Sequence, residues 1–417
     1  MKNINVVKRA VIIIGGGPAG LAAAVKLYDQ GVRDILIIER EKYLGGILRQ
    51  CIHDGFGLTR FKETLSGPEY AQRFIDEVLK REIEYVTDTT VIDITKDKLV
   101  TAASAKGIEQ YQAAAVVLAM GCRERTRHAL SIPGTRPAGI YTAGVAQAYV
   151  NLQNIMPGKN VIILGSGDIG LIMARRMTLE GANVKGVFEV LPYPSGLPRN
   201  IEQCLNDYDI PLYLSHTVVD IQGISRLEGV TIAKVDERFN PIPGTEITYP
   251  CDTLILSVGL IPENELSLAA GVELDSRTKG VIVDESYHTN VDGIFAAGNV
   301  LQVHDLADFV SAEGERLANA VTEYLEGRLK KNDTMIPVIA DDLIGYTVPQ
   351  HVAKEKDFVL SMRVRKPLND CIIELQTAAG CIRRHMLKKA LPAEMIQIPV
   401  TADMIRGARQ LEVRVVC

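Results

Sequence analysis

The stretch AVIIIGGGPAG, residues 10–20, decides the fold of this chain. A run of five apolar residues leads into three glycines at the GxGxxG spacing, Gly15, Gly17 and Gly20. A second stretch, VIILGSGDIG at residues 161–170, repeats the pattern 150 residues later. In each copy an acid ends another apolar run 24 residues beyond the first glycine, namely Glu39 and Glu189. Two strand–turn–helix–strand–acid units with the same spacing indicate two dinucleotide sites.

The three glycines of each copy have different physical tasks. The first permits a tight turn out of the strand, the second lets the backbone approach a pyrophosphate, and the third lets the helix pack closely on the strand. The helix N-terminus then presents unpaired N–H groups to the phosphates. Each acid would accept hydrogen bonds from a ribose diol. At the second site Glu189 would also repel a 2′-phosphate, so we expect NAD(H) there rather than NADP(H).

Composition places the chain among globular proteins and excludes several roles. Its 417 residues predict two to three domains. A net charge of −5 without a basic block gives no footprint for nucleic acid. Apolar runs of four to six residues are too short to span a membrane, and because the N-terminus runs directly into the first predicted strand we expect no signal peptide. Scattered cysteines without a CxxC favour a reducing cytoplasm and predict no disulfide framework, metal site or iron–sulfur cluster: Cys51, Cys122, Cys204, Cys251, Cys371, Cys381 and Cys417.

These segments, in this order, resemble the pyridine nucleotide-disulfide oxidoreductase class, flavoproteins with two dinucleotide-binding domains that include thioredoxin reductase. Four features within residues 8–330 carry the resemblance: both fingerprints, the Gly45-Gly46 pair, the strand-end turns Ala119-Met120-Gly121 and Val258-Gly259, and FAAGN at residues 295–299. The resemblance implies an α/β fold of two Rossmann-like dinucleotide-binding domains, one inserted in the other. A discontinuous FAD-binding domain would comprise residues 1–125 and 281–330, an NAD-binding domain residues 126–280, and a small, mostly β C-terminal domain residues 335–417.

A narrower resemblance rests on GGIL at residues 45–48, GCRER at 121–125, IPG at 132–134 and TAG at 142–144. These segments are similar to the FAD/NAD-binding subunits of opine dehydrogenases, hydrogen cyanide synthase and heterotetrameric sarcosine oxidase. They also resemble the flavoprotein associated with anaerobic glycerol-3-phosphate dehydrogenase. The resemblance implies an oligomer, in which partner subunits carry the substrate-oxidising flavin or an iron–sulfur centre and this chain relays electrons.

By the same resemblance, the first site holds FAD and the second holds NAD(H). The residues expected at FAD are Gly15, Gly17, Pro18, Ala19, Gly20, Glu39, Arg40, Gly45, Gly46, Ile47, Val91, Ala119, Gly121, Gly298, Asn299 and Val310. Those expected at NAD are Gly165, Gly167, Asp168, Ile169, Gly170, Glu189 and Gly259.

Three of these positions carry further expectations. Asn299 stands where the class usually has an Asp that binds the flavin ribityl chain, and an amide keeps a hydrogen-bonding oxygen while adding a donor. The helix around Val310 to Gly314 is expected to aim its N-terminal N–H groups at the flavin O2/N1 edge, which would favour the reduced flavin. Asp168 would either lie near a pyrophosphate or cap the N-terminus of its own helix.

Cys51 is the candidate for thiol chemistry. It stands alone in RQCIHDG, residues 49–55, without the CxxxxC partner of disulfide reductases. Its place is near that of the single redox cysteine of NADH peroxidases and CoA-disulfide reductases, and His53 could stabilise a thiolate. A cysteine can equally be a small buried hydrophobe. The residues alone do not rank His53, His288 and His304 as partners of a flavin.

The leading hypothesis is a cytoplasmic FAD-dependent, NAD(H)-linked oxidoreductase that moves hydride between nicotinamide and flavin as the electron-relay subunit of a larger dehydrogenase. The cofactors carry the chemistry, so no catalytic residue is assigned. The alternative is a stand-alone NADH:peroxide or disulfide oxidoreductase that uses Cys51. A third hypothesis, a regulatory or scaffold protein that catalyses no reaction, conflicts with the intact glycines and acids at both sites. The C-terminal domain would dock a partner, cover the flavin or act as a structural cap.

Overall fold

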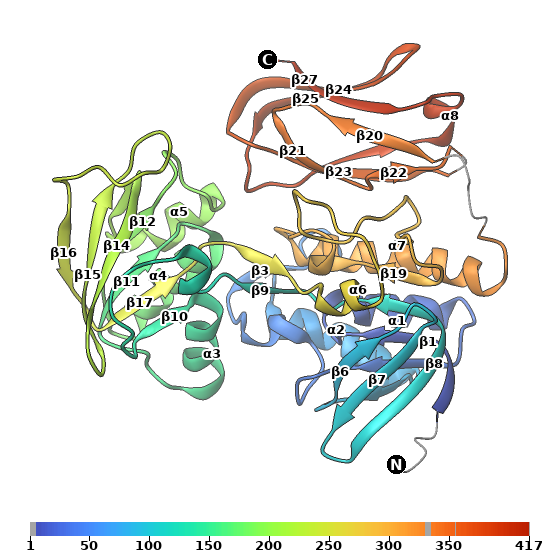
Figure 1. The fold of residues 1–417 in the computed structure, drawn as a ribbon, viewed down its shortest axis with the longest axis horizontal. Helices are drawn as coiled ribbons and strands as arrows, with labels where there is room; N and C mark the ends of the chain where they lie inside the picture. The colour runs from blue at the N-terminus through green and yellow to red at the C-terminus, as the bar shows by residue number, and fades with distance from the viewer. Residues whose placement is uncertain (1–5, 330–334, 355, 417) are drawn as a thin grey trace. The chain divides into compact units, whose positions relative to one another are not determined.

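The computed structural model describes residues 6–329, 335–354 and 356–416, and the chain forms two compact units (Figure 1). The first unit combines the chain up to Cys122 with the chain from Pro262 onward, and the second is Arg123–Ile261. The second unit is therefore an insertion in the first. The two connecting strands, β9 (Cys122–Glu124) and β18 (Leu260–Pro262), pair with each other.

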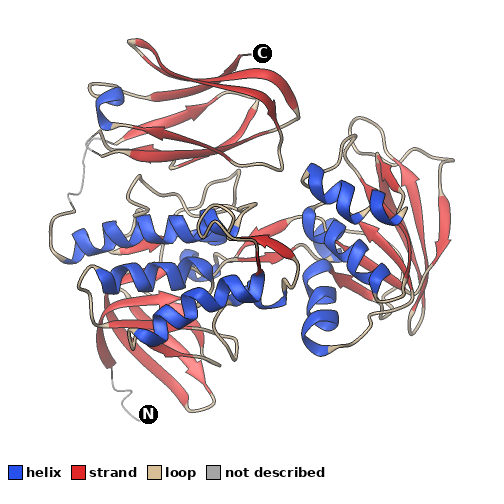
Figure 2. Ribbon diagram, turned by 180° about the vertical axis from the view of Figure 1, so that it is seen from behind, coloured by secondary structure: helices blue, strands red, loops and turns tan. Residues whose placement is uncertain are grey.

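The first unit is built on one sheet in the order β5-β2-β1-β8-β7-β6, with β19 added beside β8. Strands β1, β2, β5, β8 and β19 pair in parallel, whereas β6 and β7 pair antiparallel. The strands are β1 (Val6–Ile14), β2 (Ile35–Ile38), β5 (Glu84–Val86), β6 (Thr90–Ile94), β7 (Leu99–Ser104), β8 (Gly107–Leu118) and β19 (Ile294–Ala296). Its main helices are α1 (Pro18–Asp29), α2 (Gly67–Lys80) and α7 (Ala307–Leu325), drawn in blue in Figure 2.

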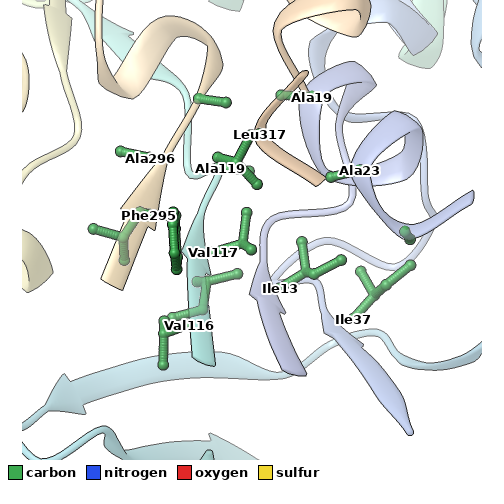
Figure 3. Packing of buried hydrophobic residues seen from close by; sticks show 14 of the residues in the cluster. Ile13, Ala19, Ala23, Ile37, Val116, Val117, Ala119, Phe295, Ala296 and Leu317 are labelled. Carbon is green, nitrogen blue, oxygen red and sulfur yellow. The ribbon is translucent and has the colours of Figure 1, made fainter. Parts of the chain in front are cut away.

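The core of this unit explains why its strands read as unbroken apolar runs. Ile13 of β1, Ile37 of β2 and Val117 of β8 are fully buried, and helices α1 and α7 add Ala23 and Leu317 (Figure 3). Strands covered on both faces show no alternation of polar and apolar residues. The run AVIII is therefore the signature of a parallel strand at the centre of a sheet.

Residues 262–280 belong to the first unit, although the sequence placed them in the second. The reason is a long-range anchor: Asn264 Nδ2 donates to Lys279 O at 3.0 Å and to Val300 O at 2.9 Å. Ala270 and Val272, which follow helix α6 (Glu265–Ala269), are buried in the core of the first unit.

The second unit repeats the parallel architecture. Its five-stranded sheet has the order β10-β17-β11-β12-β13, all parallel: β10 (Ile140–Thr142), β11 (Asn160–Leu164), β12 (Asn183–Glu189), β13 (Leu212–Leu214) and β17 (Thr253–Leu256). Its helices are α3 (Ala143–Gln153), α4 (Asp168–Leu179) and α5 (Pro198–Cys204). A second, antiparallel sheet contains β14 (His216–Gly223), β15 (Leu227–Lys234) and β16 (Ile247–Pro250).

The C-terminal region is strand-rich, as expected, and has its own hydrophobic core. One sheet has the order β22-β20-β27-β24-β25: β20 (Ile336–Ala340), β22 (His351–Val352), β24 (Leu368–Thr377), β25 (Gly380–Ala390) and β27 (Leu411–Val416). The other has the order β21-β23-β26: β21 (Ile344–Val348), β23 (Phe358–Val364) and β26 (Ile396–Val400). Both sheets contribute side chains to the same core, Leu360 and Ile398 from one and Ile373 and Leu411 from the other. Among the described helices, none combines the length and apolar character that crossing a membrane requires.

Candidate dinucleotide sites

In the first glycine turn, the packing of the protein leaves no room for a side chain at two of the three glycines but leaves room at the third. Gly15 has a φ of +106°, and a Cβ there would lie 2.4 Å from Ala119 O. A Cβ on Gly20 would lie 2.0 Å from Gly15 O. A Cβ on Gly17, in contrast, would meet no protein atom within 4 Å. Packing therefore explains Gly15 and Gly20, whereas open space beside Gly17 at the start of α1 is what a pyrophosphate requires.

The Gly45-Gly46 pair lies directly on this turn. Gly45 N donates to Gly16 O at 2.8 Å, and a Cβ on Gly46 would come 3.0 Å from Gly17 Cα. Helix α1 begins at Pro18 with Gly17 as its N-cap, and no side chain caps it. Its first N–H groups are therefore left for a bound anion. Two segments that the sequence separates by about thirty residues thus form one cradle.

Glu39 is held at the same turn by backbone N–H groups. Its side chain is buried, with the residue 5% exposed; Oε2 accepts from Gly16 N at 2.7 Å and Oε1 from Glu41 N at 2.8 Å. Each carboxylate oxygen can accept a second hydrogen bond. Glu39 is therefore oriented by the protein and still able to bind ribose hydroxyls, as the fingerprint requires.

Asn299 lies in the short 3₁₀ turn Gly298–Val300 at the end of β19. Its Oδ1 accepts from His304 N at 3.0 Å and lies 3.2 Å from His304 Nδ1, while Nδ2 donates to Cys122 Sγ at 3.5 Å. A Cβ on Gly298 would lie 2.9 Å from Ala19 Cβ, so this turn packs against the start of α1. The structure thus brings Ala19, Gly298 and Asn299 together, as expected of one site.

The expected N-terminus around Val310 to Gly314 is wrong, because α7 begins at Ala307. Its first turn contains Asp308, whose carboxylate accepts from Gly57 N at 3.1 Å and Thr59 N at 2.7 Å. Acids are favoured in a first turn by the helix dipole, and this one occupies the positive end. Val310 and Gly314 instead pack onto the cradle: a Cβ on Gly314 would lie 2.4 Å from Ala19 O.

The second glycine turn has the same geometry. Gly165 has a φ of +96°, and a Cβ there would lie 2.0 Å from Ser257 O. Gly170 N donates to Ser257 Oγ at 3.0 Å, and a Cβ on Gly170 would lie 2.6 Å from Ser257 Cβ. Gly167 is more open, with Ser257 Oγ 3.3 Å from its Cβ position. Ser257, the residue after β17, was not predicted from the sequence.

Glu189 is more completely held than Glu39. Its Oε2 accepts from Ser166 N at 2.9 Å, Ser166 Oγ at 2.6 Å and Ser195 Oγ at 2.8 Å, and its Oε1 accepts from Leu191 N at 3.0 Å. The residue is 3% exposed. The sequence marked Glu189 but neither serine, since Ser166 is a variable position of the fingerprint and Ser195 lies in a loop without periodicity.

Asp168 does not cap its own helix, so that alternative is wrong. The N-cap of α4 is Gly167, and Asp168 occupies the first helical position. Its Oδ1 accepts from Leu197 N at 2.8 Å and from Asn200 Nδ2 at 2.7 Å, which anchors the start of α5 instead. The side chain therefore faces a neighbouring helix start, where backbone N–H groups also need an acceptor.

The remaining predicted residues lie in varied surroundings. Arg40 is near Glu263, with its Nη1 3.8 Å from Glu263 Oε1. Ile47 is 58% exposed. Val91 is buried in β6, and two residues before it Thr89 N donates to Glu39 O at 3.1 Å. The last three lie at the strand ends or on α4, as expected: Gly121, Ile169 and Gly259.

Cys51 is placed unfavourably for thiolate chemistry. Burial raises the pKa of its thiol to about 12, and Sγ donates to Ile47 O at 3.4 Å. A nucleophilic cysteine needs a lowered pKa, so this thiol stays protonated at neutral pH. The six cysteines within the described residues are thiols rather than disulfides, and Cys417 lies outside the described residues.

The three histidines can now be distinguished. His53 Nδ1 lies 3.0 Å from Asp54 O, and its ring lies against Phe56 with a centroid distance of 5.2 Å. His288 Nε2 accepts from Gly293 N at 2.9 Å. His304 bonds Asn299, so it is the histidine that the structure places at the turn expected to bind flavin.

Residues 9–323 match the family described as pyridine nucleotide-disulphide oxidoreductase. The chain belongs to this family. Members of this family bind FAD and use NAD(P)H. The expected fold class is confirmed as well. Solved structures with a similar fold include the thioredoxin reductase of T. acidophilum, with a TM-score of 0.63 at 22% identity, covering 77% of this chain and 99% of that one.

Three relatives illustrate the functional range of the family. The chain is 28% identical over 287 residues to the hydrogen cyanide synthase protein HcnB of Pseudomonas protegens (63% of this chain, 59% of the relative). It is 27% identical over 314 residues to an opine oxidase subunit of Agrobacterium tumefaciens (69% and 60%). It is 26% identical over 302 residues to an NAD(P)H coenzyme A polysulfide/persulfide reductase of Pyrococcus horikoshii (71% and 63%). The match thus spans less than two thirds of each of these relatives.

Proposed function

We propose that the chain is an NADH-linked flavoprotein that passes hydride between nicotinamide and FAD and relays the electrons to a partner subunit. The observation that carries the proposal is a pair of matching sites. We call the turn of Gly15, Gly17 and Gly20 with Glu39 the first cradle, and the turn of Gly165, Gly167 and Gly170 with Glu189 the second cradle. Each has a glycine turn at a helix N-terminus without a side-chain cap, and each has a buried acid bonded to the turn. The residues present therefore fit two dinucleotides.

In the first cradle, Gly17 and the start of α1 would hold the pyrophosphate of FAD, and Glu39 the ribose. Gly298 and Asn299 would meet the flavin end, with Gly45 and Gly46 closing the turn. In the second, Gly167 and Glu189 would do the same for NAD(H). FAD, when bound, supplies a two-electron acceptor for the hydride of NADH. The protein's own contribution is to bind and orient both dinucleotides.

Two observations support the relay role: two relatives are named as subunits of larger enzymes, and the Cys51 thiol is buried. HcnB and the opine oxidase relative are both named as subunits of larger enzymes. The thiol of Cys51 is buried with a raised pKa, which argues against a disulfide exit route through it. Electrons would then leave through another protein. Purification from the native source, with identification of attached chains, tests this part; a chain that purifies alone and reduces low-molecular disulfides rapidly contradicts it.

The cofactor assignment is tested by two valine substitutions. Gly17→Val puts a branched side chain into the open space of the first cradle and should give folded but colourless protein. Gly167→Val should keep the yellow flavin but lose its rapid bleaching by NADH. Each variant is the matched control of the other. If Gly17→Val retains full flavin, the first cradle is not the FAD site.

A further inference from the structure

One buried chain of contacts leads from the C-terminal domain to the turn that contains Asn299. Its inner end is His304, whose backbone N–H and Nδ1 both approach Asn299 Oδ1, at 3.0 and 3.2 Å. A backbone N–H can only donate, so this atom of Asn299 is the amide oxygen. Nδ1 of His304 must then carry a proton as well. Nδ2 of Asn299 is left as its donor and is turned to Cys122 Sγ at 3.5 Å.

Glu313 of α7 lies at the other side of the imidazole. Nε2 of His304 is 3.5 Å from Glu313 Oε1, and the two side chains are 1% and 2% exposed. Glu313 Oε2 accepts from Gly298 N at 2.6 Å, and Oε1 accepts from Gln302 Nε2 at 3.1 Å. Burial alone would raise the pKa of Glu313, but His304 and the Gly298 N–H hold it below its usual value. Glu313 therefore contacts both the imidazole of His304 and the backbone of Gly298 at the start of the turn.

The outer end of the chain is Arg363 of β23. Its Nη2 donates to Val303 O and Asp305 Oδ1, both at 3.1 Å, and therefore grips the residues on either side of His304. Nη1 donates to Pro392 O at 2.9 Å, and Nε to the Tyr346 hydroxyl at 3.2 Å, so the guanidinium is fixed within the C-terminal domain. Five donors in a rigid fork suit such a junction, and lysine could not replace them all.

We propose that the C-terminal domain sets the conformation of the flavin-binding turn through this chain, with Arg363 and His304 as its positioning residues. The inference rests on the proposed FAD site. Arg363 fixes Val303 and Asp305, these fix His304, and His304 holds the amide oxygen of Asn299. The turn thereby offers an N–H donor to its ligand, where an Asp would offer an acceptor. The C-terminal domain is then part of the cofactor site and not only a cap.

The first test compares Arg363→Met with Arg383→Met. Arg383 lies in the same domain and donates from Nη1 to Pro399 O at 2.8 Å, far along the chain from the turn. We expect Arg363→Met to weaken FAD binding about tenfold, because it removes charge-assisted bonds that hold the turn, and to shift the visible flavin spectrum and midpoint potential. Arg383→Met should match wild type. Equal FAD affinity and equal spectra in the two variants overturn the proposal.

The second test asks whether Arg363 and His304 act in one chain. His304→Leu should weaken FAD binding, whereas His304→Asn should largely restore it, because the asparagine Nδ2 can donate in place of Nδ1. The double variant Arg363→Met/His304→Leu should bind FAD no more weakly than the worse single variant; additive losses overturn the proposal. If Arg363→Met fails to fold by circular dichroism, Asp305→Asn replaces it in the same cycle. Wild type without flavin would contradict the proposed function itself, whereas flavin-loaded wild type with unaffected variants contradicts this inference alone.

Discussion

At the scale of the residue, the hydrogen bonds to Glu189 bear most directly on which nucleotide the second site prefers. Four hydrogen bonds hold its carboxylate, from Ser166 N, Ser166 Oγ, Ser195 Oγ and Leu191 N. A carboxylate fixed in this way cannot turn away from a 2′-phosphate. Ser166 and Ser195 thus reinforce the preference for NADH over NADPH that we expect from Glu189.

We therefore expect NADH to reduce the flavin at least about tenfold faster than NADPH at equal low concentration, the size of effect that one repelled charge gives. Stopped-flow reduction measures both rates. Glu189→Gln should narrow the ratio by accelerating NADPH relative to NADH. The exposed Glu202→Gln, which removes the same charge elsewhere on the unit, serves as control and should leave the ratio unchanged. Equal rates for the two nucleotides in wild type would refute the assignment.

A second residue-scale prediction concerns Cys51. Because burial raises the pKa of its thiol to about 12, Cys51→Ser should leave NADH-to-dye activity within about twofold of wild type. It should equally leave any turnover of peroxide or low-molecular disulfides unchanged. The exposed Cys381→Ser is the matched control. Rapid peroxide or disulfide turnover that disappears only in Cys51→Ser would make Cys51 a redox centre and restore the alternative function.

At the scale of the element, the contact of α1 with α7 shapes the first cradle. Gly314 brings α7 so close that a Cβ there would lie 2.4 Å from Ala19 O, a backbone atom that cannot move aside. The close approach also places Gly298 and Val310 beside Ala19. Helix packing therefore determines the shape of the turn that is expected to receive flavin.

Gly314→Ala should lower the free energy of unfolding by roughly 1–3 kcal/mol, because it overpacks this contact. An ordinary glycine-to-alanine change inside a helix has the opposite sign and stabilises by about 0.5–1 kcal/mol. Urea unfolding of wild type and Gly314→Ala, both without flavin, shows whether the substitution lowers or raises stability. A gain in stability would show that the two helices can move apart without loss.

The elements also show what could be read from the sequence. Strand β1, the glycine turn and Glu39 were predictable because their signals are local: an apolar run, a spacing and an acid at a fixed distance. The start of α7 at Ala307 was missed because Asp308 is fixed by Gly57 and Thr59, some 250 residues earlier in the chain. Ser195 and Ser257 were missed for the same reason: their roles arise from folding, and a serine in a loop has no pattern of its own.

At the scale of the whole molecule, the joint between the C-terminal domain and the rest of the first unit contains an unusual acid. Asp284 lies beside Val283 and Glu285, which bond the C-terminal domain: Gln350 N donates to Val283 O at 3.3 Å, and Ala353 N to Glu285 Oε2 at 2.8 Å. Burial, and then the neighbouring charge of Glu285, raises the pKa of Asp284 to about 7.

This acid predicts a definite pH dependence. The folded pKa of about 7 exceeds the ordinary value of 3.8, so the folded protein binds the proton more tightly than the unfolded chain. The contribution of Asp284 to stability is full below about pH 4, falls as the pH rises from 4 to 7, and is constant above that. Asp284→Asn should remove this slope and raise stability at pH 8 by about 1–3 kcal/mol. Urea unfolding of wild type and Asp284→Asn at pH 5 and pH 8 measures this difference. If the free energy of unfolding changes by the same amount between the two pH values in both proteins, Asp284 is not the group responsible.

The place where the second unit enters the first has a consequence for how such a chain can be rebuilt. Gly121 O accepts from Glu263 N at 3.0 Å, so the two cut ends of the first unit are one hydrogen bond apart. A short turn could join them without moving either strand. The second unit, Arg123–Ile261, is in that sense a cassette: we expect that it can be excised, or exchanged for a unit with another coenzyme preference, while the sheet of the first unit keeps its register. If the second unit binds NAD(H) as proposed, one such transplantation would change the electron donor of the protein.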